Sequence, residues 1–120
     1  MLPKEYRLSA KEFPLLYKKG FKSKGKYGML ICLAKNTSTP SFGYVVSKKI
    51  GNSVKRHRMT RLLRAISMEF VKEKELNSLN FQYIAFEFCD DFNILRKEFE
   101  KQLNHCLGNI KNEKNSSVFN

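Results

Sequence analysis

Residues 41–70 read SFGYVVSKKIGNSVKRHRMTRLLRAISMEF, and the fold that we predict is built around them. Every second residue from Phe42 to Val46 is apolar or aromatic, which is typical of a strand with one buried face. Gly51 then interrupts the pattern, and Asn52 is a good helix N-cap. From there to about Phe70 the apolar residues recur with helical spacing. The stretch therefore predicts a strand, a turn and a long helix.

The predicted helix has two different faces. At about 100° per residue, an apolar arc of about 100° is formed by Met59, Leu62, Leu63, Ile66 and Phe70. The opposite arc is formed by His57, Arg61, Arg64 and Met68, with Arg56 and Arg58 at its margins. Arginine suits such a surface, because its planar fork binds a phosphate through two hydrogen bonds and also stacks on bases. We therefore expect the helix to pack on a sheet and to present arginines to a partner.

The charge of the chain is unevenly distributed. Its 120 residues include 23 Lys plus Arg and 11 Asp plus Glu, for a net charge of +12. Residues 1–64 hold 16 basic and two acidic residues, a sum of +14, whereas residues 65–120 hold seven and nine, a sum of −2. No acidic residue lies between Phe13 and Met68, so these cations cannot neutralise one another locally. Solubility needs less charge, usually of both signs, and the stretch therefore predicts a polyphosphate partner.

The start of the predicted helix adds a second feature. Lys48 and Lys49 lie between the strand and the helix, and Gly51 and Asn52 follow them. Unpaired backbone N–H groups and the helix dipole attract a phosphate at such a place, and the two lysines add charge. Lys55 falls in the apolar arc, but it lies in the first turn, where its long stem can reach water. An arginine-rich face alone can be a solvated surface; the two features side by side favour binding.

A helix is predicted upstream, over Ser9–Lys19. Ser9 and Glu12 have the spacing of a capping box, and Gly20 can end the helix. Pro14 disagrees with a start at Ser9, so the helix either kinks there or starts later. One face of this helix is formed by Phe13, Leu16 and Tyr17.

Two strands are predicted between the helices. Lys22, Lys24 and Lys26 alternate with other residues in a basic extended segment that leads into an apolar strand, Met29–Ala34. Turn-forming residues separate this strand from the one over Phe42–Ser47. The spacing predicts an antiparallel hairpin between the two apolar strands.

The second half adds a strand and a helix. Phe81–Phe88 is rich in aromatic residues and short enough for a strand. Asp90 or Asp91 can cap a last helix that Gly108 closes. Its apolar stripe is formed by Phe92, Leu95, Phe99, Leu103, Cys106 and Leu107. Residues 109–120 are polar and are expected to form a disordered tail. The order predicts one α+β domain over residues 1–108, with helices packed on a small sheet.

Several classes of protein are disfavoured. The longest apolar run, Met29–Ala34, has six residues against the ~20 of a membrane span, and the N-terminus lacks the apolar core of a signal peptide. We therefore expect a cytoplasmic protein with no membrane partner. Cys32, Cys89 and Cys106 indicate core positions and no disulfide framework. No His, Cys or acidic residues have metal-ligand spacing, so the chain is expected to hold no metal, no cofactor and no catalytic residues.

Residues 47–64, SKKIGNSVKRHRMTRLLR, closely resemble the signature of the bacterial ribonuclease P protein component. In that family the pattern reads Ser-Lys-Lys, a Gly with a small or polar residue after it, then Val-x-Arg-Asn-Arg-x-Lys-Arg-x-x-Arg. More loosely, the family spacing is kept upstream by Arg7-Leu8, Phe13, Tyr17, Gly20 and Gly43–Val46.

The sequence also departs from this family. His57 replaces the usual Asn, and Thr60 replaces the usual Lys. Where the family tends to place an Arg after the Phe81 strand, this chain has Glu87, Phe88 and Asp90 instead of that basic residue.

The resemblance implies a fold. It is that of the second domain of ribosomal protein S5, a two-layer α+β sandwich of order αβββαβα with a small mixed sheet. It includes a left-handed strand-helix-strand crossover, whereas general rules predict a right-handed one.

The resemblance also implies a function: the non-catalytic protein subunit of an endoribonuclease. The large catalytic RNA removes the 5′ leader of precursor tRNA in a magnesium-dependent reaction, and the protein binds this RNA and the leader. Contacts with the catalytic RNA are expected from Lys48, Lys49, Asn52, Lys55, Arg56, His57, Arg58, Arg61 and Arg64. A leader-binding cleft beside the first helix is expected from Phe13, Tyr17, Lys22, Lys24 and Lys26. Mg²⁺ is needed by the RNA and not by the chain itself.

Alternatives remain open from the sequence. Phe13 and Tyr17 could belong to the core of the first helix instead of a cleft, and Ile31 at the position of a family aromatic would weaken stacking. The chain could be a general RNA-binding protein of ribosomal type, with no role in tRNA processing. A protein that inserts the arginine helix into duplex DNA is a third class, but no dimerisation device is recognisable, and we expect no DNA partner.

Overall fold

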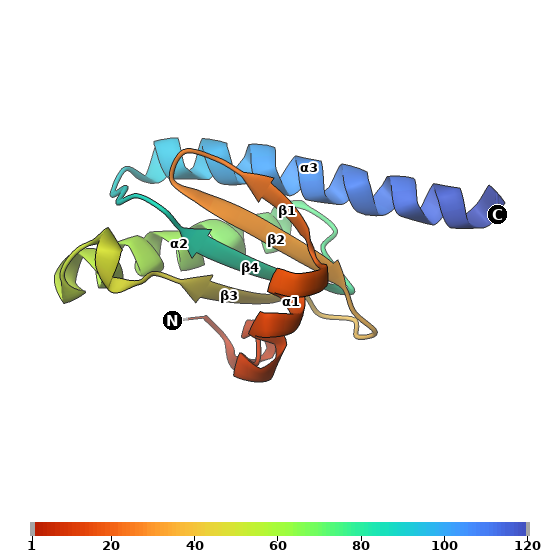
Figure 1. The fold of residues 1–120 in the computed structure, drawn as a ribbon, viewed down its shortest axis with the longest axis horizontal. Coiled ribbons are helices and arrows are strands. Elements are labelled where there is room, and N and C mark those ends of the chain that lie inside the picture. Colours follow the sequence, from red (N-terminus) through yellow and green to blue (C-terminus); the bar gives the residue numbers. More distant parts are fainter. Residues whose placement is uncertain (1, 120) are drawn as a thin grey trace.

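The structure is a computed structural model that describes the backbone of residues 2–119 and the side chains of residues 2–111. Its helices are α1 (Phe13–Lys19), α2 (Ser53–Glu73) and α3 (Phe92–Phe119). Its strands are β1 (Phe21–Lys24), β2 (Gly28–Ala34), β3 (Ser41–Val45) and β4 (Leu79–Ala85). The order along the chain is αβββαβα, as predicted (Figure 1).

The four strands form one mixed sheet in the order β1-β2-β4-β3. β2 pairs antiparallel with β1 and with β4, while β3 pairs parallel with β4. The predicted hairpin between the second and third strands is therefore wrong, because β4 lies between them. All but one of the residues of β4 are buried, on both faces of the strand. Such a strand lies at the centre of a sheet, where both of its faces are covered. The residues of the turn between β2 and β3 do not show that another strand lies between these two.

The connection from β3 through α2 to β4 is left-handed. In Figure 1, with α1 in front, β3 and β4 point to the left, β4 lies above β3, and α2 passes behind the sheet. About 98% of such connections are right-handed, so general rules did not predict this one. Only the family resemblance implied a left-handed connection. With the same strand order, a right-handed path would place α2 on the face that carries α1. The left-handed path leaves α2 and α3 on one face and α1 alone on the other.

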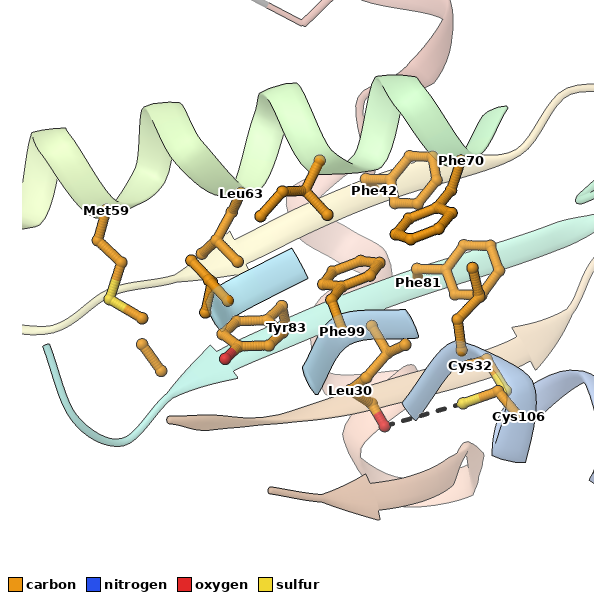
Figure 2. Close-up of a cluster of buried hydrophobic side chains, with 14 of the residues drawn as sticks. Leu30, Cys32, Phe42, Met59, Leu63, Phe70, Phe81, Tyr83, Phe99 and Cys106 are labelled. Atoms are coloured by element: carbon orange, nitrogen blue, oxygen red, sulfur yellow. Dashed lines mark hydrogen bonds between the residues drawn. The ribbon is translucent and has the colours of Figure 1, made fainter. Parts of the chain in front are cut away.

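The main core lies between the sheet and the layer of α2 and α3. Figure 2 shows aromatic rings from α2, α3, β3 and β4 in this cluster. The Phe99 ring of α3 stacks with Phe70 of α2 and with Tyr83 of β4, each at 5.9 Å between ring centres. Phe42 and Phe81 stack at 5.0 Å on the neighbouring strands. Aromatic rings from two helices and two strands thus form one continuous core.

A smaller apolar cluster holds α1 on the other face of the sheet. Leu16 of α1 is fully buried with Met29 and Ile31 of β2. The Phe13 ring lies directly against Gly43 of β3, where a Cβ atom would collide with it. Only glycine allows this close approach of ring and strand.

The start of α1 resolves the conflict over its proline. The Glu12 carboxylate accepts a hydrogen bond from the Ser9 N–H at 3.2 Å, so the predicted capping box is present. It begins a 3-10 turn over Ala10–Glu12, and the α-helix starts at Phe13. Pro14 therefore lies in the first turn of the α-helix, where its missing N–H costs nothing. The later start is confirmed.

The last helix begins as predicted and ends later. The Asp91 carboxylate caps it by accepting a hydrogen bond from the Ile94 N–H at 3.0 Å. The prediction that Gly108 closes the helix is wrong, because α3 continues through it. Gly108 has open space around it, and an exposed glycine costs a helix only about 1 kcal/mol. The helix also runs over residues 109–119, part of the segment expected to be a disordered tail. The side chains of residues 112–120 lie outside the described residues, and the disorder of residues 109–120 stays a prediction.

Two further predictions concern the core and membranes. Cys32, Cys89 and Cys106 are buried free thiols, as the sequence indicated. Among the described residues, no helix has the length and apolar character that crossing a bilayer requires.

Candidate RNA interface

The start of α2 is built by a turn that only glycine allows. Lys48–Ile50 forms a 3-10 turn after β3, and Gly51 follows with φ 153° and ψ −167°, a region essentially closed to other residues. The side-chain oxygen of Asn52 accepts a hydrogen bond from the Lys55 N–H at 3.0 Å. The predicted N-cap is confirmed. The side-chain oxygen of Asn52 thus caps the helix. A contact of this side chain with RNA stays a prediction.

The two predicted faces of α2 are confirmed. Its inner face is fully buried at Met59, Leu63, Ile66 and Phe70 and half-buried at Leu62. Its outer face is exposed at His57 and Arg61 and half-buried at Arg64 and Met68. Apolar contacts with the sheet therefore hold the helix, and the cationic groups are free to point away from it.

The N-terminal half of α2 carries the helix's arginines, and almost all of them lack an ion-pair partner among residues 2–111. Arg58 lies 3.6 Å from the Asp90 carboxylate, with both side chains more than half exposed. Such a pair contributes at most about 1 kcal/mol. Within residues 2–111 no other arginine of this half forms an ion pair. Glu69 and Glu73, in the last turns of α2, bind Arg96 of α3 at 3.0 Å each and not the arginines upstream.

The outer surface of α2 is hollowed in two places. The first hollow, of about 410 Å³, is lined by Val54, His57, Arg58, Arg61 and Leu62. The second, of about 240 Å³, is lined by Leu2, Arg61, Arg64, Ala65 and Met68. Each combines apolar side chains with guanidinium groups, which suits the base and the phosphate of a nucleotide. Arg61 lines both hollows and lies between them. We call the outward-facing Arg61 and Arg64 the arginine ridge.

The other basic residues predicted for this surface lie around it. Lys48 and Lys49 are exposed in the turn before α2. The ammonium of Lys55 lies 5.5 Å from the centre of the Phe88 ring, toward the loop between β4 and α3. Arg56 is half-buried, and its backbone oxygen accepts a hydrogen bond from Thr60 at 2.8 Å. These residues therefore widen the cationic surface without belonging to the arginine ridge.

The face of α1 predicted as one unit is divided in the structure. Leu16 is core, Phe13 is half-buried against the sheet, and Tyr17 is 55% exposed. The Lys22 ammonium of β1 lies 5.0 Å from the centre of the Tyr17 ring. The core alternative is therefore wrong for Tyr17. Ile31, where the family has an aromatic, is buried under α1, so it offers no stacking surface.

The other two lysines predicted for the cleft, Lys24 and Lys26, lie in different places. Lys24 is exposed on the same side of β1 as Lys22, because strand side chains alternate. Lys26 lies in the turn after β1, at the end of the strand farther from α1. Its backbone N–H and that of Tyr27 donate to the Glu98 carboxylate of α3 at 2.6 and 3.0 Å. The structure thus brings Tyr17 and Lys22 together and places Lys26 nearer α3.

Raised pKa values are found for a thiol in the core and for a tyrosine hydroxyl that lies beneath α2. A hydrogen bond with Cys32, together with burial, raises the pKa of the Cys106 thiol. Burial raises the pKa of the Tyr44 hydroxyl, which donates to Ser67 at 2.7 Å. Protonated, buried groups of this kind are poor nucleophiles. Within residues 2–111, no cluster of three or more His, Cys, Asp or Glu could hold a metal ion. The described surface is suited to binding an anion.

Comparison with known proteins identifies the family. The family model described as Ribonuclease P matches residues 2–111. This chain belongs to the ribonuclease P protein family. Its similarity to the ribonuclease P protein component of Macrococcus caseolyticus is 33% identity over 109 residues, which covers 88% of this chain and 90% of that protein. The component from Alkaliphilus metalliredigens is 31% identical over 100 residues, covering 83% and 87%. A shorter match, 34% over 76 residues, covers 62% of this chain and 66% of the component from Kocuria rhizophila.

Solved structures of ribonuclease P proteins share the fold. The protein from Thermotoga maritima superposes with a TM-score of 0.70 at 20% identity, covering 83% of this chain and 94% of that one. The protein from Staphylococcus aureus gives a TM-score of 0.68 at 22% identity, covering 82% and 93%. The expected α+β fold with its mixed sheet is thus confirmed.

This member of the ribonuclease P protein family departs from the signature at two positions that the structure places on α2. His57 is exposed and lines the first hollow. The Thr60 hydroxyl donates to the backbone of Arg56, so it is turned toward its own helix. On this side of α2 the chain therefore has an imidazole in place of the amide of the signature, and it has one cation fewer than the signature.

One cation near this surface was not among the predicted site residues. Arg7 lines a further hollow together with Arg64. The sequence offered a single signal, the family spacing of Arg7-Leu8. Because the two arginines are far apart along the chain, only the folded structure shows that they are neighbours.

Proposed function

We propose that this chain is the protein subunit of a ribonuclease P that matures the 5′ ends of tRNA in the cytoplasm. It binds a catalytic RNA through α2 and the 5′ leader of precursor tRNA beside α1. The RNA performs the magnesium-dependent hydrolysis, and the chain contributes no catalytic residue and holds no cofactor of its own. The observation that carries this proposal is the uncompensated arginine ridge of α2 in a member of the ribonuclease P protein family.

The α2 surface supports binding of a folded RNA. Its arginines are attached to a helix that is locked to the sheet by fully buried residues, so they are presented by a rigid element. Folded RNA concentrates phosphates, and each phosphate neutralised by a cation releases counterions. A large catalytic RNA also repels itself, so a polycation bound to it reduces the magnesium needed for its compact form.

The α1 surface supports binding of a single strand. Tyr17 presents an exposed ring, and Lys22 and Lys24 supply charge on the same side of the sheet. Single-stranded nucleic acids bind where a basic surface runs past aromatic faces, at about 1–3 kcal/mol per stacked base. The leader is the single-stranded part of precursor tRNA. Its path beside Tyr17 is therefore the chemically suitable one.

The first test measures the magnesium requirement of cleavage. Precursor tRNA is incubated with the matching catalytic RNA over a magnesium series, with and without the chain. We expect half-maximal cleavage at several-fold lower magnesium when the chain is present, because its cations replace part of the screening by the metal. The chain alone should leave the substrate intact. Identical magnesium curves with and without the chain would refute the proposal.

The second test concerns the leader. Tyr17→Ala should reduce the preference of the assembled complex for precursor over mature tRNA by about fivefold or more, from the loss of one stacked base. Leu15→Ala is the matched control, because Leu15 is 44% exposed on the same short helix. Both changes should cost less than about 0.5 kcal/mol of stability. Filter binding with the two tRNA forms measures the preference.

The leader test also separates the alternative of a ribosomal-type RNA-binding protein. Such a protein would bind precursor and mature tRNA equally in its complex. An equal affinity of the wild-type complex for both forms would therefore contradict leader binding. An unchanged preference in Tyr17→Ala would leave the function standing but remove Tyr17 from it.

A further inference from the structure

The N-terminal segment, residues 2–8, lies against the sheet and beside α2. Leu2 is 3% exposed and belongs to the main core. The backbone of Arg7 forms a parallel β-bridge with Phe42 of β3, and the Leu8 N–H donates to the Phe42 oxygen at 2.9 Å. The segment therefore extends the β3 edge of the sheet and is held in a defined place.

These contacts also hold the Arg7 side chain. Its Nε–H donates to the backbone oxygen of Leu2 at 2.8 Å, and its backbone N–H donates to Lys4 at 3.2 Å. Within residues 2–111 the terminal nitrogens of Arg7 bond no protein acceptor and form no ion pair. These nitrogens form the edge of the guanidinium that binds phosphate. A fixed guanidinium loses little side-chain entropy on binding.

Arg7 and Arg64 line the same hollow, of about 310 Å³. The other residues that line it are Leu2, Leu8, Phe42, Tyr44 and Thr60. It thus has two guanidinium groups, an apolar and aromatic lining and no carboxylate. Like charges placed together without a counterion repel each other, so the arrangement favours an anion between them. The apolar lining favours a ligand that also carries a flat or carbon-rich part.

We propose that Arg7 and Arg64 bind one phosphodiester group of an RNA strand in this hollow, with the sugar or base of that nucleotide against Tyr44. The proposal rests on the function proposed above and adds a contact point outside the signature on α2. Leu8, which lines the hollow, also contacts the Gly43 position where the Phe13 ring lies. The hollow therefore lies between the α2 surface and the α1 surface, and RNA bound there connects the two.

The test compares Arg7→Gln with Lys4→Gln. Lys4 is exposed in the same segment and does not line the hollow, so the two variants lose the same charge at different places. We expect Arg7→Gln to weaken RNA binding about tenfold, as for a lost charged hydrogen bond, and to lower the salt slope by about one. Lys4→Gln should change affinity less than about twofold. Equal effects of the two variants would overturn the proposal.

Two titrations identify the source of the phosphodiester. The first uses the catalytic RNA alone, and the second uses precursor tRNA added to the assembled complex. If Arg7→Gln weakens binding in the first titration, a backbone phosphate of the catalytic RNA occupies the hollow. If it weakens binding only in the second titration, the leader occupies the hollow. An absence of loss in both would refute the site while leaving the magnesium effect, and thus the proposed function, intact.

A double-mutant cycle tests whether Arg7 and Arg64 share one phosphate. If they do, the losses caused by Arg7→Gln and Arg64→Gln are not additive, and the double variant binds about as weakly as the weaker single variant. Fully additive losses would show two separate contacts and contradict the shared site.

The wild-type chain provides a readout that does not depend on the folding of a variant. Phenylglyoxal modifies accessible guanidinium groups, and mass spectrometry of peptides reports the extent at each arginine. RNA should protect Arg7 and Arg64 several-fold, while Arg96, whose guanidinium binds Glu69 and Glu73, should react equally with and without RNA. Unchanged modification of Arg7 in the RNA complex would overturn the proposal.

Discussion

Arg61→Ala should weaken binding of the catalytic RNA about tenfold, and Arg61→Ala with Arg64→Ala about a hundredfold. Each side chain contributes charged hydrogen bonds of about 1.5–3 kcal/mol, part of which is screened at a surface. The slope of log affinity against log salt should fall by about one for each arginine removed. Titrations at several salt concentrations measure both quantities.

The control for this prediction is Lys101→Ala. Lys101 is an exposed cation on α3, away from the arginine ridge, and its loss should change the affinity less than about twofold. The melting temperature of every variant should stay within a few degrees, because Arg61 and Arg64 form no ion pair within residues 2–111. An affinity and a salt slope equal to those of Lys101→Ala would show that the ridge is only a solvated surface.

Phe99→Ala should destabilise the protein by about 3–5 kcal/mol, as expected for removal of a buried aromatic ring. Phe99 is 1% exposed, and its ring stacks on both Phe70 and Tyr83 (Figure 2). It therefore connects α3, α2 and β4, so the cavity left behind would lie where three elements meet. A loss of this size is a large part of the about 5–15 kcal/mol that stabilises a typical domain. Urea titration measures it.

The matched control lies on the same helix. Ile94 is 49% exposed, so Ile94→Ala should cost less than about 0.5 kcal/mol. Similar losses for the two variants would mean that α3 does not pack as the structure describes. At a temperature where both variants are folded, their affinity for RNA should equal that of the wild type, because neither residue lies on a proposed RNA surface.

Different parts of this molecule were predictable to different degrees. The position and the faces of α2 followed from its apolar spacing, and the N-cap at Asn52 followed from its residue type. These are local properties, since a helix repeats every 3.6 residues whatever surrounds it. The hairpin between β2 and β3 failed because strand pairing depends on which strand is buried on both faces. Spacing along the chain does not carry that information.

The candidate RNA surface shows the same division. The arginine ridge could be predicted because all its members lie on one helix. The distinction between Leu16 and Tyr17 could not, because adjacent residues of a short helix are separated only by where the sheet lies. The pairing of Arg7 with Arg64 was equally out of reach, because it arises from a bridge between the N-terminal segment and β3.

The order of residues along the chain was enough to predict an α+β domain with a cationic helix and a resemblance to ribonuclease P proteins. Apolar periodicity, helix caps and a contiguous signature depend only on residues that are close together along the chain. The folded chain was needed to show that β4 lies between β2 and β3, that Tyr17 stays at the surface, and that Arg7 and Arg64 line one hollow. Such contacts join residues distant along the chain, and they form because burying apolar surface outweighs the entropy lost in closing the loops between them.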